Sequence, residues 1–478
     1  MTRTAVPGDG AGGRHATPGR TARGLNPAAV VPVVCALAAV TAGAGLTPPG
    51  NAPPLPPGTP TGAPVPAPEN DSPPAAPTLP GPAAPTLPGP AVAGAARAPA
   101  VPFGGHRRSY APGALRPTGT RADVDARVVA LYRQWRAAFV RTHCVGAHVI
   151  SPDAEVPVVG EAQGYGLLVA AYLAGADPGA RELFDAILGY VLAHPSSRDG
   201  DLLAAEQDAY CRDVNGGDSA TDADLDIAYA LLLAHRQWGS RGRHDYRVLA
   251  LRRIAAIARS EVDPVTHLLR LGDWATGSGE LARTSRTSDW MLDHLRAFRR
   301  ATGDPYWDMV RRAHQRALSN LLAGPGAGTG LVPDFVVDTH AAPRPAAGRV
   351  LESEHDGQYS WNACRVPLRV GVDAVTSGDA RSVAAARAVT RWVRRATGGD
   401  PAAVSSGYAL DGTPLAAGAH PAFVAPLAVA ALSDPTAQPW LDALWRHLVA
   451  TPVSSHGYYA ASVQLLSMIV VSGNYWVP

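Results

Sequence analysis

Apolar residues recur at helical spacing through most of the chain beyond residue 122, and this pattern leaves little room for a sheet-based fold. In the first such segment the apolar positions are three or four residues apart, so they share one face of a helix. These positions are Val124, Val128, Leu131, Trp135 and Phe139. Strand-like alternation is scarce. The folded part of the chain is therefore predicted to be all-α.

The same spacing predicts about twelve helices. The candidate ranges are 123–140, 161–175, 179–193, 224–239, 244–260, 288–302, 304–323, 363–376, 378–396, 419–432, 437–450 and 456–472. A dozen helices in one domain indicate paired helices arranged in a ring, although periodicity alone does not separate a closed barrel from an open solenoid. Two long loops, 195–223 and 324–362, interrupt the helices, and long loops in compact domains often carry function.

The N-terminal region has a different character from the helical part. Arginines precede an uncharged stretch, residues 26–46, that ends in small residues, which is the layout of a secretory signal peptide. We expect residues 1–46 to be this signal and the protein to be secreted. A signal-anchored form remains an alternative, but no stable membrane span is expected after cleavage.

Residues 47–103 are dominated by Pro, Ala and Gly and contain the octet APTLPGPA twice, at 76–83 and 84–91. Such a composition cannot bury a core, so we expect a disordered linker. The folded domain is then predicted to span residues 104–478, and we expect it to be a monomer.

Charge and cysteine content narrow the possible partners. The net charge is +2 and the arginines are scattered, so no nucleic-acid partner is expected. Cys35 lies in the signal segment. Two of Cys144, Cys211 and Cys364 could form a disulfide in an oxidising compartment, or all three could be small buried side chains. Their spacing is not that of a zinc site.

Two acidic segments stand at the starts of predicted helices. Glu161 begins GEAQGYGLLVAAY, residues 160–172, and Asp222 and Asp224 begin the helical part of ATDADLDIAYALLLAHRQW, residues 220–238. Acids at a helix start can have a purely structural role, because their negative charge interacts favourably with the helix dipole. Taken together, however, the two segments resemble the signature segments of glycoside hydrolase family 8, whose members are inverting enzymes that cut β-1,4-linked glucans, chitosan or xylan.

The resemblance continues along the chain. It includes LGDW (271–274), SRTSDWMLDHLRAF (285–298), YSWNACRVPLR (359–369) and GYYAASVQLLSMIVVSGNYW (457–476). It thus covers nearly everything from about residue 107 to the end. It implies an (α/α)6 barrel and a chemistry that needs two carboxyl groups and water, without a metal or organic cofactor.

The resemblance also implies roles for the acids. Glu161 matches the general acid of the family, and Asp222 matches the carboxylate that steadies the distorted sugar, with Asp224 as the second choice. A general acid must hold its proton, whereas a helix N-terminus favours the ionised form. We expect burial and the like charge of Asp222 to raise the pKa of Glu161.

The residue at the position of the general base differs from that in part of the family. Many members have aspartate in the pattern Y-x-x-D-A-x-R, where this chain has Asn362, and asparagine cannot take a proton from water. A branch of the family with asparagine here takes a glutamate from the preceding loop. Glu352 is the predicted base, and Glu354 and Asp356 remain open.

Aromatic and polar residues beside these motifs are candidates for sugar binding, because sugars stack their apolar faces on Trp and Tyr. The predicted substrate-binding residues are Tyr165, Asp224, Trp274, Trp290, Tyr359, Asn362 and Arg365. Core packing is the alternative for each aromatic. The substrate is expected to be β-1,4-glucan or chitosan, and xylan is the less favoured alternative. Chitosan is a polycation, so acids in the 195–223 loop such as Glu206 would favour its binding.

Gly164 and Gly166 interrupt the first turns of the helix that Glu161 begins. Each costs roughly 1 kcal/mol relative to alanine. They indicate either that a sugar or a neighbouring helix approaches the backbone closely, or only that small residues pack helix on helix.

Two other functions fit parts of the pattern. One is a polysaccharide-binding protein that kept the cleft and lost catalysis. The other is a polysaccharide lyase, which would use Tyr or His as its base and leave an unsaturated product.

Overall fold

Helices form nearly all the regular structure of the computed structural model, which describes residues 98–106, 110–152 and 154–478. The predicted signal peptide and most of the predicted linker lie outside the described residues. The α-helices are α1 (Arg121–Phe139), α2 (Gly160–Tyr172), α3 (Ala180–Ala193), α4 (Thr221–Trp238), α5 (Tyr246–Ala256), α6 (Leu292–Thr302), α7 (Tyr306–Ala323), α8 (Val366–Ser377), α9 (Ala380–Ala396), α10 (Pro421–Ala431), α11 (Gln438–Ala450) and α12 (Tyr458–Val471). Each corresponds to one predicted helix.

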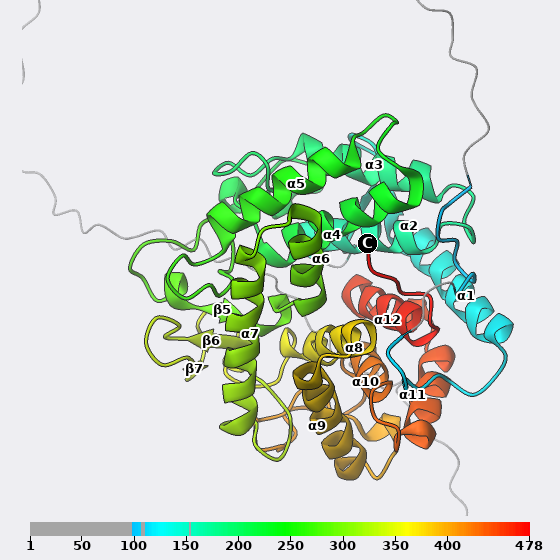
Figure 1. Ribbon diagram of the computed structural model, residues 1–478, viewed down its shortest axis with the longest axis vertical. Coiled ribbons are helices and arrows are strands. Elements are labelled where there is room, and N and C mark those ends of the chain that lie inside the picture. Colours follow the sequence, from blue (N-terminus) through cyan, green and yellow to red (C-terminus); the bar gives the residue numbers. More distant parts are fainter. Residues whose placement is uncertain (1–97, 107–109, 153) are drawn as a thin grey trace, which may run out of the picture. The chain divides into compact units, whose positions relative to one another are not determined.

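The even-numbered helices form an inner ring and the odd-numbered helices pack outside it (Figure 1). Every residue of α2, α10 and α12 is buried, as expected for helices enclosed on all sides. Each inner helix contacts the next, and α12 contacts α2, so the ring closes. The predicted (α/α)6 barrel is confirmed.

Short strands occur in the loops that lead from an outer helix into an inner one. They are β1 (Val140–Arg141), β2 (His148–Val149), β3 (Val158–Val159), β4 (Glu206–Gln207), β5 (Ser285–Arg286), β6 (Phe335–Val337) and β7 (Arg344–Pro345). All pairings are antiparallel: β1 with β2, β3 with β4, and β6 with both β5 and β7. These loops therefore gather at the N-terminal ends of the inner helices.

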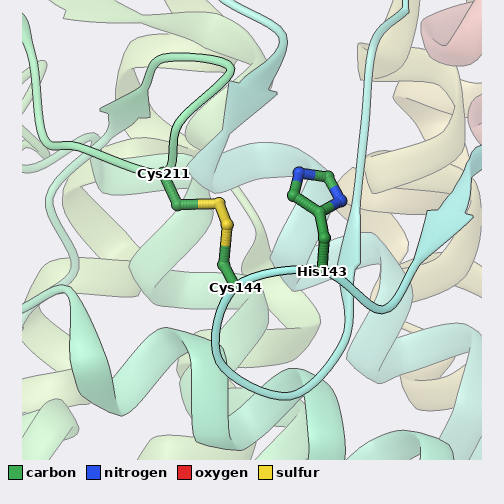
Figure 2. Close-up of side chains that lie close together, drawn as sticks. All are labelled: His143, Cys144 and Cys211. Atoms are coloured by element: carbon green, nitrogen blue, oxygen red, sulfur yellow. A yellow bond between two sulfur atoms is a disulfide. The ribbon is translucent and has the colours of Figure 1, made fainter.

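The cysteines resolve one alternative left open by the sequence. Cys144 and Cys211 form a disulfide across 67 positions of the chain, and His143 lies beside it (Figure 2). Cys364 is a free, buried thiol. The disulfide joins the β1–β2 loop to the loop between α3 and α4.

Hydrogen bonds to the helical domain begin a few residues before the predicted domain start. The Val101 N–H donates to Oε1 of Gln237 at 2.7 Å, and the Phe103 N–H donates to the Ala174 carbonyl at 2.7 Å. The last residues of the predicted linker thus contact α4 and the turn that follows α2. No helix among the described residues is both long and apolar enough to cross a membrane.

The glycines of α2 lie where other elements approach it. A Cβ on Gly164 would stand 2.9 Å from Cβ of Asp226 on α4, and one on Gly166 would stand 2.7 Å from Cγ2 of Val149. Both distances are shorter than real Cβ contacts allow. Close packing of neighbouring elements, rather than approach of a sugar, accounts for these two positions.

We expect Gly164→Ala to lower the free energy of unfolding by about 1–3 kcal/mol, because overpacking outweighs the gain in helix propensity. Urea denaturation of the full chain measures this change. Gly189→Ala in α3 is the matched control, since no atom lies within 4 Å of its added Cβ, and it should raise stability. Stabilisation by both substitutions would contradict the packing explanation.

Candidate active site

Glu161 lies in the first turn of α2, where the β3 strand turns into the helix. Its side chain is buried. Oε1 accepts a hydrogen bond of 2.6 Å from the Tyr458 hydroxyl, and Oε2 pairs with the Arg365 guanidinium. The carboxyl group is therefore held by one neutral and one charged donor.

Asp222 reaches the same guanidinium from the first turn of α4. Oδ2 of Asp222 lies 3.0 Å from Nη1 of Arg365, the nitrogen that also contacts Glu161. Arg365 is itself buried and comes from a short 3₁₀ turn, η5 (Ala363–Arg365). One cation thus brings two carboxyl groups from different helices together.

The surroundings push the two carboxyl groups in opposite directions. Burial raises the pKa of Glu161 above its ordinary value against the influence of Arg365, and the charge of Asp222 adds to the rise. Burial also favours the neutral form of Asp222, but Arg365 and Arg286 outweigh it and hold the pKa of Asp222 below its ordinary value. Two adjacent carboxyl groups whose pKa values are shifted in opposite directions are typical of sites that carry out acid–base chemistry.

Glu352 approaches the same site from the loop between α7 and α8. Asn362 Nδ2 donates to Oε2 of Glu352 at 2.7 Å, and Arg286 Nη2 lies 3.1 Å from its Oε1. Burial raises the pKa of Glu352, while Arg286 and the hydrogen bond from Asn362 oppose that rise. Asn362 also accepts from Arg365 through its Oδ1 at 2.9 Å, so hydrogen bonds link Glu352 to Glu161 through Asn362 and Arg365.

One pocket brings these groups together. Its lining includes all three predicted catalytic acids and several of the predicted binding residues. The lining residues are Val159, Gly160, Glu161, Ala205, Glu206, Ala220, Asp222, Leu271, Trp274, Arg286, Leu351, Glu352, Asn362 and Arg365. The pocket lies among the loops at the N-terminal ends of α2 and α4.

The two other candidate bases lie elsewhere. Glu354 is exposed and does not line the pocket. Asp356 is fully buried, and its carboxylate accepts backbone N–H groups of four consecutive residues, 350–353, at 2.8 to 3.1 Å. Because these donors occupy both oxygens, Asp356 shapes the loop that carries Glu352 and is not free to take a proton from water.

Only some of the seven predicted binding residues line the pocket. Trp274, Asn362 and Arg365 line the pocket. Tyr165 is buried behind it, and its hydroxyl accepts from Arg365 at 3.2 Å. We therefore place Tyr165 among the groups that hold Arg365 rather than among those that touch a ligand.

Three further predicted binding positions need correction. Asp224 is fully buried, pairs with Arg253 and accepts from the Leu203 N–H at 3.1 Å, because it points to the opposite side of the helix start from Asp222. Trp290 and Tyr359 are each 3% exposed and belong to the hydrophobic core. For these two aromatics the core-packing alternative is the one observed.

The sequence interpretation missed three groups at the site. Arg286 lies on β5, Asp289 ends the turn η4 (Thr287–Asp289), and Tyr458 begins α12. Burial raises the pKa of Asp289 to about 7, and its Oδ1 accepts from Ser288 at 2.9 Å. All three lie within stretches quoted for the family resemblance, 285–298 and 457–476, so membership in those stretches was the signal that could have found them.

Comparison with known proteins identifies the family of the chain. The family model "Glycosyl hydrolases family 8" matches residues 122–473, which is most of the chain. The chain belongs to glycosyl hydrolases family 8. It is therefore a glycoside hydrolase.

Individual relatives of this family 8 hydrolase cover most of its length. It is 38% identical over 383 residues to a "Beta-glucanase" of Niallia circulans, covering 80% of this chain and 93% of the relative. It is 32% identical over 378 residues to an "Endoglucanase" of Bacillus sp. (strain KSM-330), covering 77% and 80%. The apo structure of a beta-1,3-1,4-glucanase from Paenibacillus sp. X4 matches with a TM-score of 0.77 and 38% identity, covering 80% of this chain and all of that one.

The arrangement of charges in this family 8 hydrolase yields a prediction that is independent of turnover. Replacing Asp222 by asparagine removes a negative charge that raises the pKa of Glu161, so the pKa of Glu161 should fall. Infrared difference titration with labelled glutamate measures it, and Glu161→Gln identifies the band. Glu354→Gln is the control with no expected effect. A pKa of Glu161 that rises or stays constant in Asp222→Asn would contradict the assignment.

Proposed function

We propose that this family 8 enzyme is an endo-acting hydrolase of β-glucan that works with inversion at the anomeric carbon. One observation carries the proposal: Glu161 and Glu352 reach the same pocket from separate elements, and Asp222 lies beside Glu161. An inverting hydrolase needs an acid on one side of the bond and a base on the other, about 6.5–9.5 Å apart, with a water between base and sugar.

In the proposed reaction Glu161 donates its proton to the glycosidic oxygen as the bond to the anomeric carbon breaks. Glu352 removes a proton from a water molecule, whose oxygen forms the new bond on the opposite face of the sugar. Asp222 stays ionised next to the positive charge that develops on the ring. The raised pKa of Glu161 and the lowered pKa of Asp222 suit these roles.

Asn362 and Arg286 have a supporting role in this scheme. Asn362 holds one oxygen of Glu352 and Arg286 holds the other. Their donors favour the ionised form that a base needs. Asparagine at this position thus orients a base that comes from the loop instead of serving as one.

The names of the relatives support glucan over chitosan as the substrate, since all three reported relatives are named as glucanases. We propose chains with β-1,4 linkages, including mixed-linkage glucan. We also propose that the protein is secreted and is a monomer. The Cys144–Cys211 disulfide supports secretion, because disulfides form and persist in oxidising compartments.

A substrate panel tests the proposal. The full-length protein is incubated with mixed-linkage β-glucan, carboxymethylcellulose, chitosan and xylan, with Glu161→Gln as the blank. We expect new reducing ends from the glucans, a rapid fall in viscosity, and α-anomers as the first products by NMR. β-anomers would contradict inversion. Unsaturated products would indicate a lyase, and binding without cleavage would indicate a non-catalytic protein.

Substitutions in the loop test which acid is the base. Glu352→Gln should lower kcat by about 10²–10⁴, the usual contribution of acid–base catalysis, with little change in fold by circular dichroism. Glu354→Gln, two residues away and exposed, is the matched control and should retain wild-type kcat. Equal activity of the two variants would exclude Glu352 as the base.

The acid role predicts a pH effect with a definite sign. Glu161 must be protonated to act, so kcat should fall as pH rises through its raised pKa. Glu161→Gln should lose this alkaline limb together with most activity on polymers. A pH–rate profile of wild type and variant measures it, and an alkaline limb that persists unchanged in Glu161→Gln would assign it to another group.

A further inference from the structure

A hairpin leads outward from the pocket wall. Glu206, which lines the pocket, begins it, and β4 pairs with β3 directly before Glu161. The chain returns through a bridge between Gln207 and Asp213 and a 3.0 Å hydrogen bond from the Val214 N–H to the Glu206 carbonyl. The tip, residues 208–212, therefore lies within six positions of a residue that lines the pocket.

The tip of this hairpin is held in place. The Cys211–Cys144 disulfide ties it to the β1–β2 loop (Figure 2). Oδ1 of Asp208 accepts the N–H groups of Tyr210 and Arg212 at 2.9 and 3.0 Å, and its Oδ2 accepts from Arg212 Nε at 2.8 Å. A covalent link and three local hydrogen bonds reduce the ordering that a ligand would otherwise have to impose.

Tyr210 projects from this rigid tip. It is 79% exposed, more than any other large hydrophobic residue among those described. The Arg212 guanidinium carbon lies 5.2 Å from the centre of its ring, so the ring has a cation on one face. Packing against the core does not explain the residue, and no shape constraint of the turn requires an aromatic ring there.

We propose that Tyr210 is a sugar-stacking platform of an outer subsite, which binds the glucan chain where it leaves the pocket past Glu206. The proposal rests on the proposed function. An aromatic ring with a polar edge offers an apolar face to the sugar and a hydroxyl to water. Arg212 keeps the ring in place from one side, which leaves the other side to the sugar.

Kinetics on substrates of different length test this subsite. We expect Tyr210→Ala to raise KM for polymeric glucan by about tenfold, or ~1.4 kcal/mol, and to raise KM much less for an oligosaccharide that only fills the pocket. Tyr210→Trp should restore the preference for the long chain. Val265→Ala, another exposed apolar residue outside the pocket lining, is the matched control and should behave as wild type.

Affinity electrophoresis in gels containing glucan gives a second measurement that needs no turnover. In the Glu161→Gln background, Tyr210→Ala should be retarded less than its parent. Equal retardation, or an equal rise of KM on long and short substrates, would overturn the subsite. If the wild type hydrolyses no glucan but Tyr210→Ala still reduces retardation in the gel, the proposed function is refuted and the subsite is retained.

Discussion

The buried guanidinium of Arg365 is the interaction on which the rest of the site depends. Its Nη1 contacts Glu161 and Asp222, and its Nη2 donates to Ser288 Oγ and Asn362 Oδ1 at 3.0 and 2.9 Å. A buried cation without such partners would cost several kcal/mol. The start of α2, the start of α4 and two loop turns must therefore assemble together around it, so the stability of the barrel depends on the same contacts that position the proposed catalytic acids.

Two other carboxylates serve the backbone rather than the reaction. Oδ1 of Asp334 accepts the N–H groups of Ser360, Asn362 and Ala363 at 2.6 to 3.1 Å, and Asp356 accepts those of residues 350–353. Each side chain thus accepts several backbone N–H groups of one short segment. These loops present Asn362 and Glu352 to each other, so the predicted base is positioned by acids that have no part in the chemistry.

The sequence predicted the helices well, because their apolar residues form a recognisable pattern. It predicted poorly which way individual side chains point. The apolar pattern located all twelve α-helices of the described residues: burial on one face leaves a repeating pattern, and helices buried on all faces appear as continuous apolar runs. It did not say toward which side a residue beside a motif points, and so Asp224, Trp290 and Tyr359 were assigned to binding although they are buried away from the pocket. Arg286 was missed because its partner Glu352 is 66 positions away, and no local pattern announces such a pair.

The helix dipoles at the site would lower the pKa of both Glu161 and Asp222, so the raised pKa of Glu161 needs an explanation. Glu161 and Asp222 both lie in the first turn of an inner helix, where the positive end of the dipole favours ionised carboxylates. The pKa of Asp222 shifts in the direction that this field favours, and Arg365, Arg286 and Arg369 lower it as well. The pKa of Glu161 shifts the other way, because burial favours its neutral form and ionising it would place a second negative charge beside Asp222 on Arg365. Arg365 and Arg286 lower the pKa of both carboxyl groups, but the net shift is downward only for Asp222. The shared cation can balance one negative charge, so the two carboxyl groups compete for it, and the directions of the shifts assign that charge to Asp222.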